Sequence, residues 1–328
     1  MSKESIANGM IQQNGARTDR NQDIPETTAH AAHVAAPEQH VVDDPPPDPN
    51  YPRYRVMPDA ALKLARTQHE QTINLLEIDP NESEHYTDKK DVEKELKKQR
   101  DRISELQARL YAEQKQSLLI VLQAMDTGGK DGTIKGVFRG VNPQGCQVWS
   151  FKAPSSEEQE HDFLWRYHAK APRRGMITIF NRSHYEDVLI VRVKQMIPED
   201  VWKHRYQMIN EFEHMLTLNN TTVIKFFLYI SRDEQKRRLE SRLADPTKHW
   251  KFSSNDVKER AYWDQYMGAF EDAINNCSTP YAPWYVIPAN RKWYRNLVVA
   301  RTIADTLEAM NSQYPPAEEG LESVMIPD

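Results

Sequence analysis

The strongest hydrophobic pattern in the chain is a short uninterrupted run that gives way to glycines. Residues 118–122 read LLIVL, which has the length and composition of a strand buried on both faces. The sequence DTGGKDG follows at 126–132, and apolar positions at helical spacing resume at Ile134, Val137 and Phe138. Strand, glycine loop and helix in this order are typical of phosphate-binding sites, because backbone N–H groups converge at the helix N-terminus.

Further apolar runs alternate with helical patterns along the rest of the chain. This alternation favours one large α/β domain with a parallel sheet. Including the first run, five strands are predicted, and the other four lie at 147–151, 176–180, 223–230 and 284–288. Helical patterns are found at 60–76, 89–116, 157–169, 201–216, from 262 onward and at 293–310.

The glycine loop departs from the standard phosphate-binding motif at two positions. Ala124 stands where that motif has its first glycine, and Asp131 stands where it has a metal-binding hydroxyl. Lys130 supplies a mobile positive charge. Asp126 is unusual, because a carboxylate among phosphates is repulsive unless a cation such as Mg²⁺ lies between them. We therefore interpret Asp126 as a metal-anchoring acid.

Polar residues gather where the 176–180 strand ends, in the sequence NRSHYED at 181–187. The carboxyl edge of a parallel sheet is where ligands bind. Arg182 is suited to bidentate contact with phosphate oxygens, and Glu186 or Asp187 either holds a cation or caps the next helix. For His184 a hydrogen-bonded positioning role is favoured over that of a general base.

Residues 231–262 form a candidate lid. Residues 231–260 include nine basic and six acidic residues, and Asp245-Pro246 breaks the helical pattern. Two helices joined at a proline break and lined by cations can fold over a polyanion and exclude water, which otherwise competes as phosphoryl acceptor. The alternative is a solvated pair of charged helices.

Composition narrows the class of protein further. The 328 residues carry a formal charge of −5 and a pI near 6.2, which argues against a general nucleic-acid binder. Two cysteines make no disulfide framework, and no apolar stretch is long enough to span a membrane. Without a secretory signal the protein is expected to be cytoplasmic. We predict a disordered tail at 1–53, a domain at 54–312 and a loose tail at 313–328.

Five segments together resemble the polyphosphate kinase 2 family. They are DTGGKDG at 126–132, GVNPQG at 140–145, FKAPS at 151–155, FNRSHYED at 180–187 and APWYVIPA at 282–289. They occur in the family's order. The NPQG and NRSHYED versions are most similar to the branch that phosphorylates both nucleoside monophosphates and diphosphates, known as class III.

The resemblance implies a P-loop kinase fold, a three-layer αβα sandwich with a helical lid. It also implies reversible transfer of the terminal phosphoryl group of inorganic polyphosphate to adenine nucleotides, with guanine nucleotides as a further candidate. The cofactor it implies is Mg²⁺ or Mn²⁺, and the assembly is a homo-oligomer, dimer or tetramer. The residues it implies are catalytic Asp126, Lys130 and Arg182; nucleotide- or phosphate-binding Thr127, Gly128, Gly129, Asp131, Gly132, Asn181 and Ser183; polyphosphate-binding Lys152, Arg173, Arg174, Arg237, Arg242, Lys248 and Lys251; and metal-binding Asp126 and Glu186.

At one position the residue type differs from that of many members of the family. Asn181 stands where they have an aspartate that serves as a second metal anchor, so either Glu186 supplies the carboxylate or Asp126 carries most of the metal binding. Two other functions remain open on the sequence. An ATP-dependent nucleoside monophosphate kinase shares the loop and lid, and a P-loop protein that binds nucleotide or polyphosphate without turnover has the same cradle.

Overall fold

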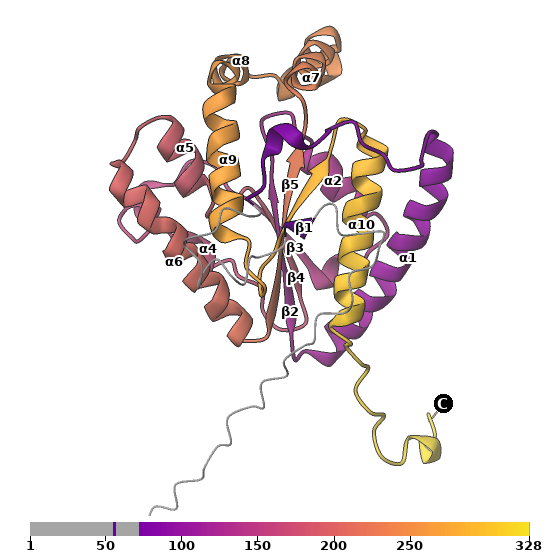
Figure 1. Ribbon diagram of the computed structural model, residues 1–328. Helices are drawn as coiled ribbons and strands as arrows, with labels where there is room; N and C mark the ends of the chain where they lie inside the picture. The colour runs from indigo at the N-terminus through magenta and orange to yellow at the C-terminus, as the bar shows by residue number, and fades with distance from the viewer. Residues whose placement is uncertain (1–54, 57–71, 328) are drawn as a thin grey trace, which may run out of the picture. The chain divides into compact units, whose positions relative to one another are not determined.

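A parallel sheet is the scaffold of the described part of the chain (Figure 1). The computed structural model describes residues 55–56 and 72–327, so the tail predicted at 1–53 lies outside the described residues. The predicted five-stranded parallel sheet is confirmed. Its strands lie in the order β3 (Cys146–Ser150), β4 (Ile177–Asn181), β2 (Ser117–Gln123), β5 (Thr221–Tyr229) and β6 (Trp284–Pro288). A short strand that the pattern did not predict, β1 (Arg55–Val56), pairs antiparallel with β6.

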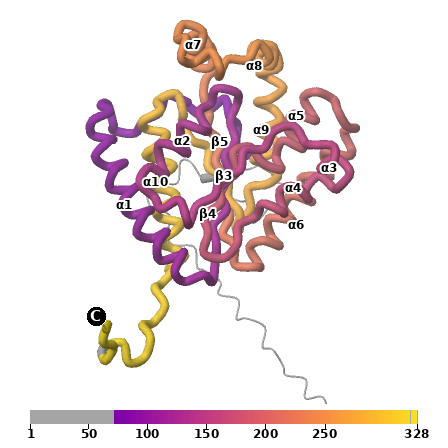
Figure 2. Tube along the Cα trace, turned by 180° about the vertical axis from the view of Figure 1, so that it is seen from behind, coloured from indigo at the N-terminus to yellow at the C-terminus, as the bar shows by residue number. Residues whose placement is uncertain are grey.

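Helices cover both faces of this sheet, which confirms the three-layer architecture (Figures 1 and 2). One face carries α1 (Lys89–Glu113), α2 (Lys130–Val137) and α10 (Lys292–Ala309), and α10 packs against the other two. The opposite face carries α4 (Trp165–His168), α5 (Glu186–Val193), α6 (Glu199–Leu218) and α9 (Trp263–Cys277). The segment predicted as a lid, for which we keep that name, stands above the carboxyl ends of the strands and consists of α7 (Arg232–Ala244), a 3₁₀ turn at Pro246–Lys251 and α8 (Ser254–Glu259).

Local signals explain where most elements begin and end. Every residue of β2 is buried, as its unbroken apolar run predicts. Helix α1 begins where the Asp88 carboxylate accepts the Lys90 N–H, and it ends at Gln114, whose φ of 53° is left-handed. Ser231 caps α7 in the same way as Asp88 caps α1. Helix α7 ends at Ala244, and Pro246 begins the 3₁₀ turn, as the proline break predicts.

Two helical predictions were wrong in part. The 157–169 pattern forms two single turns, α3 (Ser156–Gln159) and α4, because Asp162 accepts the Leu164 N–H and begins a new turn. The described end of the 60–76 pattern is a 3₁₀ turn capped by Asn74, and the remainder lies outside the described residues.

The register of the sheet brings the predicted motifs to one edge. Leu122 of β2 pairs with Asn181 of β4, and Asn181 also pairs with Ser150 of β3. The three loops that follow these strands therefore emerge side by side beneath the lid. No helix in the described ranges has the length and apolarity needed to cross a membrane.

Candidate active site

Both glycines of the loop between β2 and α2 are required by close packing. Gly129 has a φ of 104°, and a Cβ there would lie 2.0 Å from Arg295 Nη1. A Cβ at Gly128 would lie 2.5 Å from the Cβ of Ala124. The loop therefore folds tightly back on the end of β2. In this arrangement it presents the N-terminus of α2 to the space beneath the lid.

Lys130 begins α2 and is buried in the loop. Its Nζ donates to the Ala124 carbonyl at 2.8 Å. Burial and, to a smaller extent, the nearby Arg182 guanidinium lower the pKa of Lys130 to about 8, against the opposing effect of Asp126, Glu186 and Asp131. The lysine is thus a cation at neutral pH that loses its charge as the pH rises through about 8.

The turn after β4 meets the glycine loop through two polar contacts. Arg182 Nη2 donates to Asp126 Oδ1 at 3.0 Å, and Arg182 Nε lies 4.0 Å from Glu186 Oε1. Asn181 Nδ2 donates to Asp131 Oδ1 at 2.6 Å. Arg182 has a φ of 61°, and Thr127 in the loop has a φ of 63°. Left-handed backbone at non-glycine residues is costly and concentrates at functional sites, so both turns have the character of a preorganised site.

A fully buried polar network lies behind this turn. Glu213 of α6 accepts from Tyr185 OH at 3.0 Å, makes an ion pair with Lys225 of β5 and bonds His184 Nε2 at 3.1 Å. Lys225 also donates to the Cys277 carbonyl at 2.7 Å. The prediction that His184 is hydrogen-bonded within the protein is confirmed. The network ties the 181–187 turn to β5 and α6 beneath the site.

Glu213→Gln is expected to lower the free energy of unfolding by about 3 kcal/mol, because it leaves the buried Lys225 ammonium without an anion. The measurement is urea unfolding at a fixed protein concentration. Glu211→Gln, an exposed position on the same helix, is the matched control and should be near neutral. Equal stability of Glu213→Gln and wild type would contradict the importance of this network.

Two buried arginines support the glycine loop from behind, and sequence reasoning did not select either as a site residue. Arg238 of α7 donates to the carbonyls of Thr127 at 3.0 Å and Gly128 at 2.9 Å. Arg295 of α10 lies beside Gly129 and contacts the Gly128 carbonyl at 3.4 Å. A signal existed for Arg295, because it occupies the buried stripe of α10 four residues before Val299.

The glycine loop opens into a cavity of about 800 Å³ beneath the lid, which we call the lid cavity. Ten cationic and four acidic side chains line it, so its potential is strongly positive. Thr127 Oγ1 is buried in its wall and has no partner among the described residues. The cations are Lys130, Lys152, Arg182, Arg237, Arg238, Arg242, Lys248, Lys251, Lys292 and Arg295.

A second cavity of about 500 Å³, the side cavity, adjoins the first over α5 and the 151–167 segment. Its wall differs from that of the lid cavity, because it contains four cationic side chains, six acidic ones and several aromatic rings. The rings are Phe151, His161, Phe163, Tyr167, Tyr266 and Phe270. The residues that line both cavities are Asp126, Phe151, Lys152, Arg182 and Asp256.

Most residues singled out from the sequence line one of these cavities. The loop residues 126–132, Asn181, Arg182, Lys152 and the lid cations Arg237, Arg242, Lys248 and Lys251 line the lid cavity. Glu186 lines the side cavity.

Three residues lie elsewhere, and their placement corrects the expectation. Arg173 and Arg174 precede β4, so they lie at the amino edge of the sheet, opposite the glycine loop. Ser183 is fully buried and accepts from Gln123 Nε2 at 3.2 Å, so it holds the turn against β2 and faces neither cavity.

The donor set at the junction of the cavities suits Mg²⁺. Asp126 lines both cavities, and so does Asp256 of α8. Among the described residues, no three His, Cys, Asp or Glu side chains are arranged to hold a metal by themselves. Mg²⁺ binds commonly through one or two carboxylates together with substrate phosphates and water, so these residues fit it.

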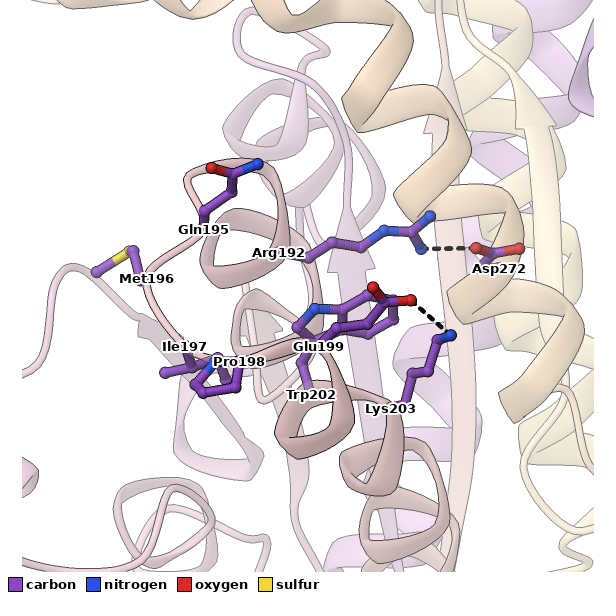
Figure 3. Close-up of a pocket in the computed structure, with 9 residues that line it drawn as sticks. All are labelled: Arg192, Gln195, Met196, Ile197, Pro198, Glu199, Trp202, Lys203 and Asp272. Atoms are coloured by element: carbon purple, nitrogen blue, oxygen red, sulfur yellow. Dashed lines mark hydrogen bonds and ion pairs between the residues drawn. The ribbon is translucent and has the colours of Figure 1, made fainter.

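A third cavity lies away from the glycine loop, between the α5–α6 connection and α9 (Figure 3). Arg192 pairs with Asp272 at 2.6 Å and lies over the Trp202 ring, 4.7 Å from its centroid. Lys203 pairs with Glu199 at 2.6 Å. Because both cations in its wall are neutralised, we assign this cavity no anion.

Comparison with known proteins agrees with this geometry. The family model "Polyphosphate kinase 2 (PPK2)" matches residues 86–315. An AMP/ADP-polyphosphate phosphotransferase from Meiothermus ruber is 49% identical over 275 residues, which are 84% of this chain and 99% of that protein. An ADP-polyphosphate phosphotransferase from Rhodopseudomonas palustris is 45% identical over 242 residues, 70% of this chain and 84% of that protein.

A solved structure gives the same result for the fold. The crystal structure of polyphosphate kinase 2 from Arthrobacter aurescens TC1 superposes with a TM-score of 0.75 at 42% identity, and the match covers 82% of this chain and 95% of that chain. The family match spans the glycine loop, the 181–187 turn, the lid and α10, which are the parts that build the two cavities. This chain belongs to the polyphosphate kinase 2 family.

Proposed function

We propose that this protein transfers the terminal phosphoryl group of inorganic polyphosphate to nucleoside monophosphates and diphosphates, converting AMP to ADP and ADP to ATP. The observation that carries the proposal is the pair of adjoining cavities with opposite charge balance. The cationic lid cavity suits a polyanion, and the aromatic side cavity suits a nucleotide base. The names of the Meiothermus ruber and Rhodopseudomonas palustris relatives support this choice.

Transfer takes place where the cavities meet. Phosphoryl transfer between phosphates depends on alignment and on neutralising charge over the equatorial oxygens, so it needs cations in fixed positions. Lys130 and the α2 N-terminus hold the donor phosphate, and Arg182, which lines both cavities, binds the transferred group. Asp126 would hold Mg²⁺, with Glu186 as the second candidate ligand. The chemistry that Mg²⁺ would supply there is neutralisation of phosphate charge.

Asn181 fits this arrangement without acting as a metal ligand. Its amide N–H donates to Asp131, which stands in the position of the usual metal-binding hydroxyl. A carboxylate at 181 would repel Asp131 at this distance, whereas the amide fixes it. We propose that Asn181 orients the first turn of α2 and leaves metal binding to Asp126.

The test is to incubate the purified protein with long-chain polyphosphate and Mg²⁺, with AMP in one tube and ADP in another, and to separate the nucleotides by chromatography. ATP in both tubes, with ADP appearing first in the AMP tube, supports the proposal. ATP from ADP alone removes the monophosphate activity. No product with polyphosphate, together with phosphorylation of AMP by ATP, would favour an ordinary nucleotide kinase. An Asp126→Asn protein purified identically controls for contaminating adenylate kinase.

The pH dependence is expected to follow Lys130. Its pKa of about 8 in the free enzyme means that its positive charge is present below that pH and is lost as the pH rises through it. Because kcat/KM reports the free enzyme, kcat/KM for polyphosphate should fall above about pH 8, while kcat at saturating polyphosphate falls at higher pH. Bound phosphate stabilises the ammonium, which explains the difference. Steady-state assays from pH 6.5 to 9.5 measure kcat/KM and kcat. A kcat/KM that does not change over this range would contradict the assignment of the pH dependence to Lys130.

A further inference from the structure

Arg295 is a buried cation without an anion. Its side chain is 2% exposed and lines the lid cavity from α10. The guanidinium donates to Asn296 Oδ1 at 2.8 Å and to the Gly128 carbonyl at 3.4 Å. Among the described residues no carboxylate lies within 4.0 Å of it, and its charged neighbour is another arginine, Arg238. Burial and that neighbour lower the pKa of Arg295 to about 9.

Of the other four buried cations in the described part of the chain, Lys130 also has no ion pair and also lines the lid cavity, whereas the remaining three have an acidic partner. Lys225 pairs with Glu213, Arg238 with Glu234 at 2.7 Å, and Arg166 lies 3.3 Å from Glu158. This is the usual pattern, because a buried charge is costly unless an opposite charge compensates it. Arg295 departs from the pattern, as Lys130 does, and both side chains line the lid cavity.

The surroundings of Arg295 add positive charge. Arg237, Arg238 and Lys292 line the same part of the lid cavity, and Glu234 is shared between Arg237 and Arg238. The backbone of Gly129, at the N-terminus of the eight-residue helix α2, packs directly on the Arg295 guanidinium. A helix N-terminus and an uncompensated guanidinium in contact are both complementary to phosphate.

We infer that Arg295 binds a phosphate group of the polyphosphate chain and that the chain supplies the anion that Arg295 lacks. The inference rests on the proposed function and extends it to α10. Arg295 lines the lid cavity and not the side cavity, so the phosphate it binds is one beyond the transferred group, on the part of the donor that leaves. Arg295 is therefore a donor-binding residue, while Arg182 lies where the cavities meet.

This role has a consequence for stability. Without a bound polyanion, the charge of Arg295 opposes folding, because the guanidinium gives up water and gains no anion. Replacing it with an apolar side chain of similar length should therefore stabilise the free protein. Gly128 keeps its contact with Arg238 in such a variant, so the loop carbonyl is not left unpaired. Polyphosphate should stabilise the wild type and lose most of this effect in the variant.

The experiment measures the thermal unfolding midpoint of the full chain in phosphate-free buffer, with and without inorganic tripolyphosphate, in the absence of nucleotide and metal. Arg295→Met is expected to unfold at a higher temperature than the wild type without the anion. It should lose more than half of the tripolyphosphate-induced rise in Tm. In turnover assays, KM for polyphosphate should increase about tenfold with a smaller change in kcat, as loss of one charged hydrogen-bonding partner predicts.

Arg301→Met is the matched control on the same helix. Arg301 has an acidic partner, Glu84, at 3.6 Å, so its replacement should lower Tm and leave the tripolyphosphate-induced rise unchanged. Arg295→Gln removes the charge but keeps a donor, and the same loss of the anion effect is expected of it if Arg295→Met does not fold. Sodium chloride at matched ionic strength controls for screening.

The outcome separates this inference from the proposed function. If Arg295→Met or Arg295→Gln keeps the full tripolyphosphate-induced rise in Tm, Arg295 does not bind the donor, and the inference is overturned. If Arg295→Met lowers Tm as Arg301→Met does, the charge is not uncompensated, and the inference also fails. Either result leaves polyphosphate-dependent ATP synthesis by the wild type untouched, and that activity is measured separately.

Discussion

Asp126→Asn is expected to reduce turnover at least about a thousandfold while the protein folds normally. Asp126 lies at the junction of both cavities, and its carboxylate accepts from Arg182 at 3.0 Å. The amide keeps an oxygen for that hydrogen bond and removes the charge that attracts Mg²⁺. Without the cation, repulsion between donor and acceptor phosphates is no longer neutralised in the transition state, which is the main task of such a site.

Steady-state assays across a range of Mg²⁺ concentrations measure the effect, and isothermal titration of Mg²⁺ in the presence of tripolyphosphate measures metal binding directly. Asp264→Asn, an exposed position at the start of α9, controls for purification and for loss of a carboxylate in general. A correctly folded Asp126→Asn protein with a tenth of wild-type activity would rule out Asp126 as the principal metal ligand.

The parts of the fold that the sequence predicted are those with strong local signals. The run at 118–122 is apolar because β2 is buried on both faces, and the glycines follow because the loop folds back on that strand. The proline at 246 breaks the lid because its ring cannot continue α7. Each of these signals lies within a few residues of the structure that it specifies.

The predicted site residues that were wrong are close in sequence to the site but lie elsewhere in the fold. Arg173 and Arg174 are close in sequence to the 181–187 turn, but a strand separates them, and its two ends lie at opposite edges of the sheet. Ser183 is adjacent to Arg182, yet its side chain is fully buried and accepts a hydrogen bond from Gln123 of β2. A sequence motif does not show which of its side chains face the ligand.

Arg238 and Arg295 were missed for a related reason. Charged residues are usually exposed, so a basic residue in a helix is normally assigned to a solvated face. Whether an arginine is buried depends on the elements that pack over it, which for Arg238 and Arg295 are the glycine loop and its neighbours, distant in sequence. The contacts of Arg238 and Arg295 with the glycine loop therefore depend on tertiary packing, whereas the loop itself is specified by its local sequence.

Lys130→Ala is expected to lower kcat/KM for polyphosphate at least about a thousandfold with little change in stability. Lys130 is the cation that begins α2, and its charge adds to the N-terminal field of that helix at the wall of the lid cavity. Truncation of the side chain leaves the backbone N-terminus of α2 in place but removes the ammonium, so the charge that develops on the donor phosphate loses its nearest cation in the glycine loop.

Stability should be retained because the Lys130 ammonium is buried and its charge is already disfavoured, as its lowered pKa indicates. Removing it relieves that cost and leaves only the Ala124 carbonyl without a partner. Lys135→Ala, on the exposed side of the same helix, should keep near-wild-type activity and Tm. The same comparison tests the pH dependence, because the residual activity of Lys130→Ala should no longer fall near pH 8. A residual profile that still falls there would assign that titration to a different group and remove Lys130 from the donor site.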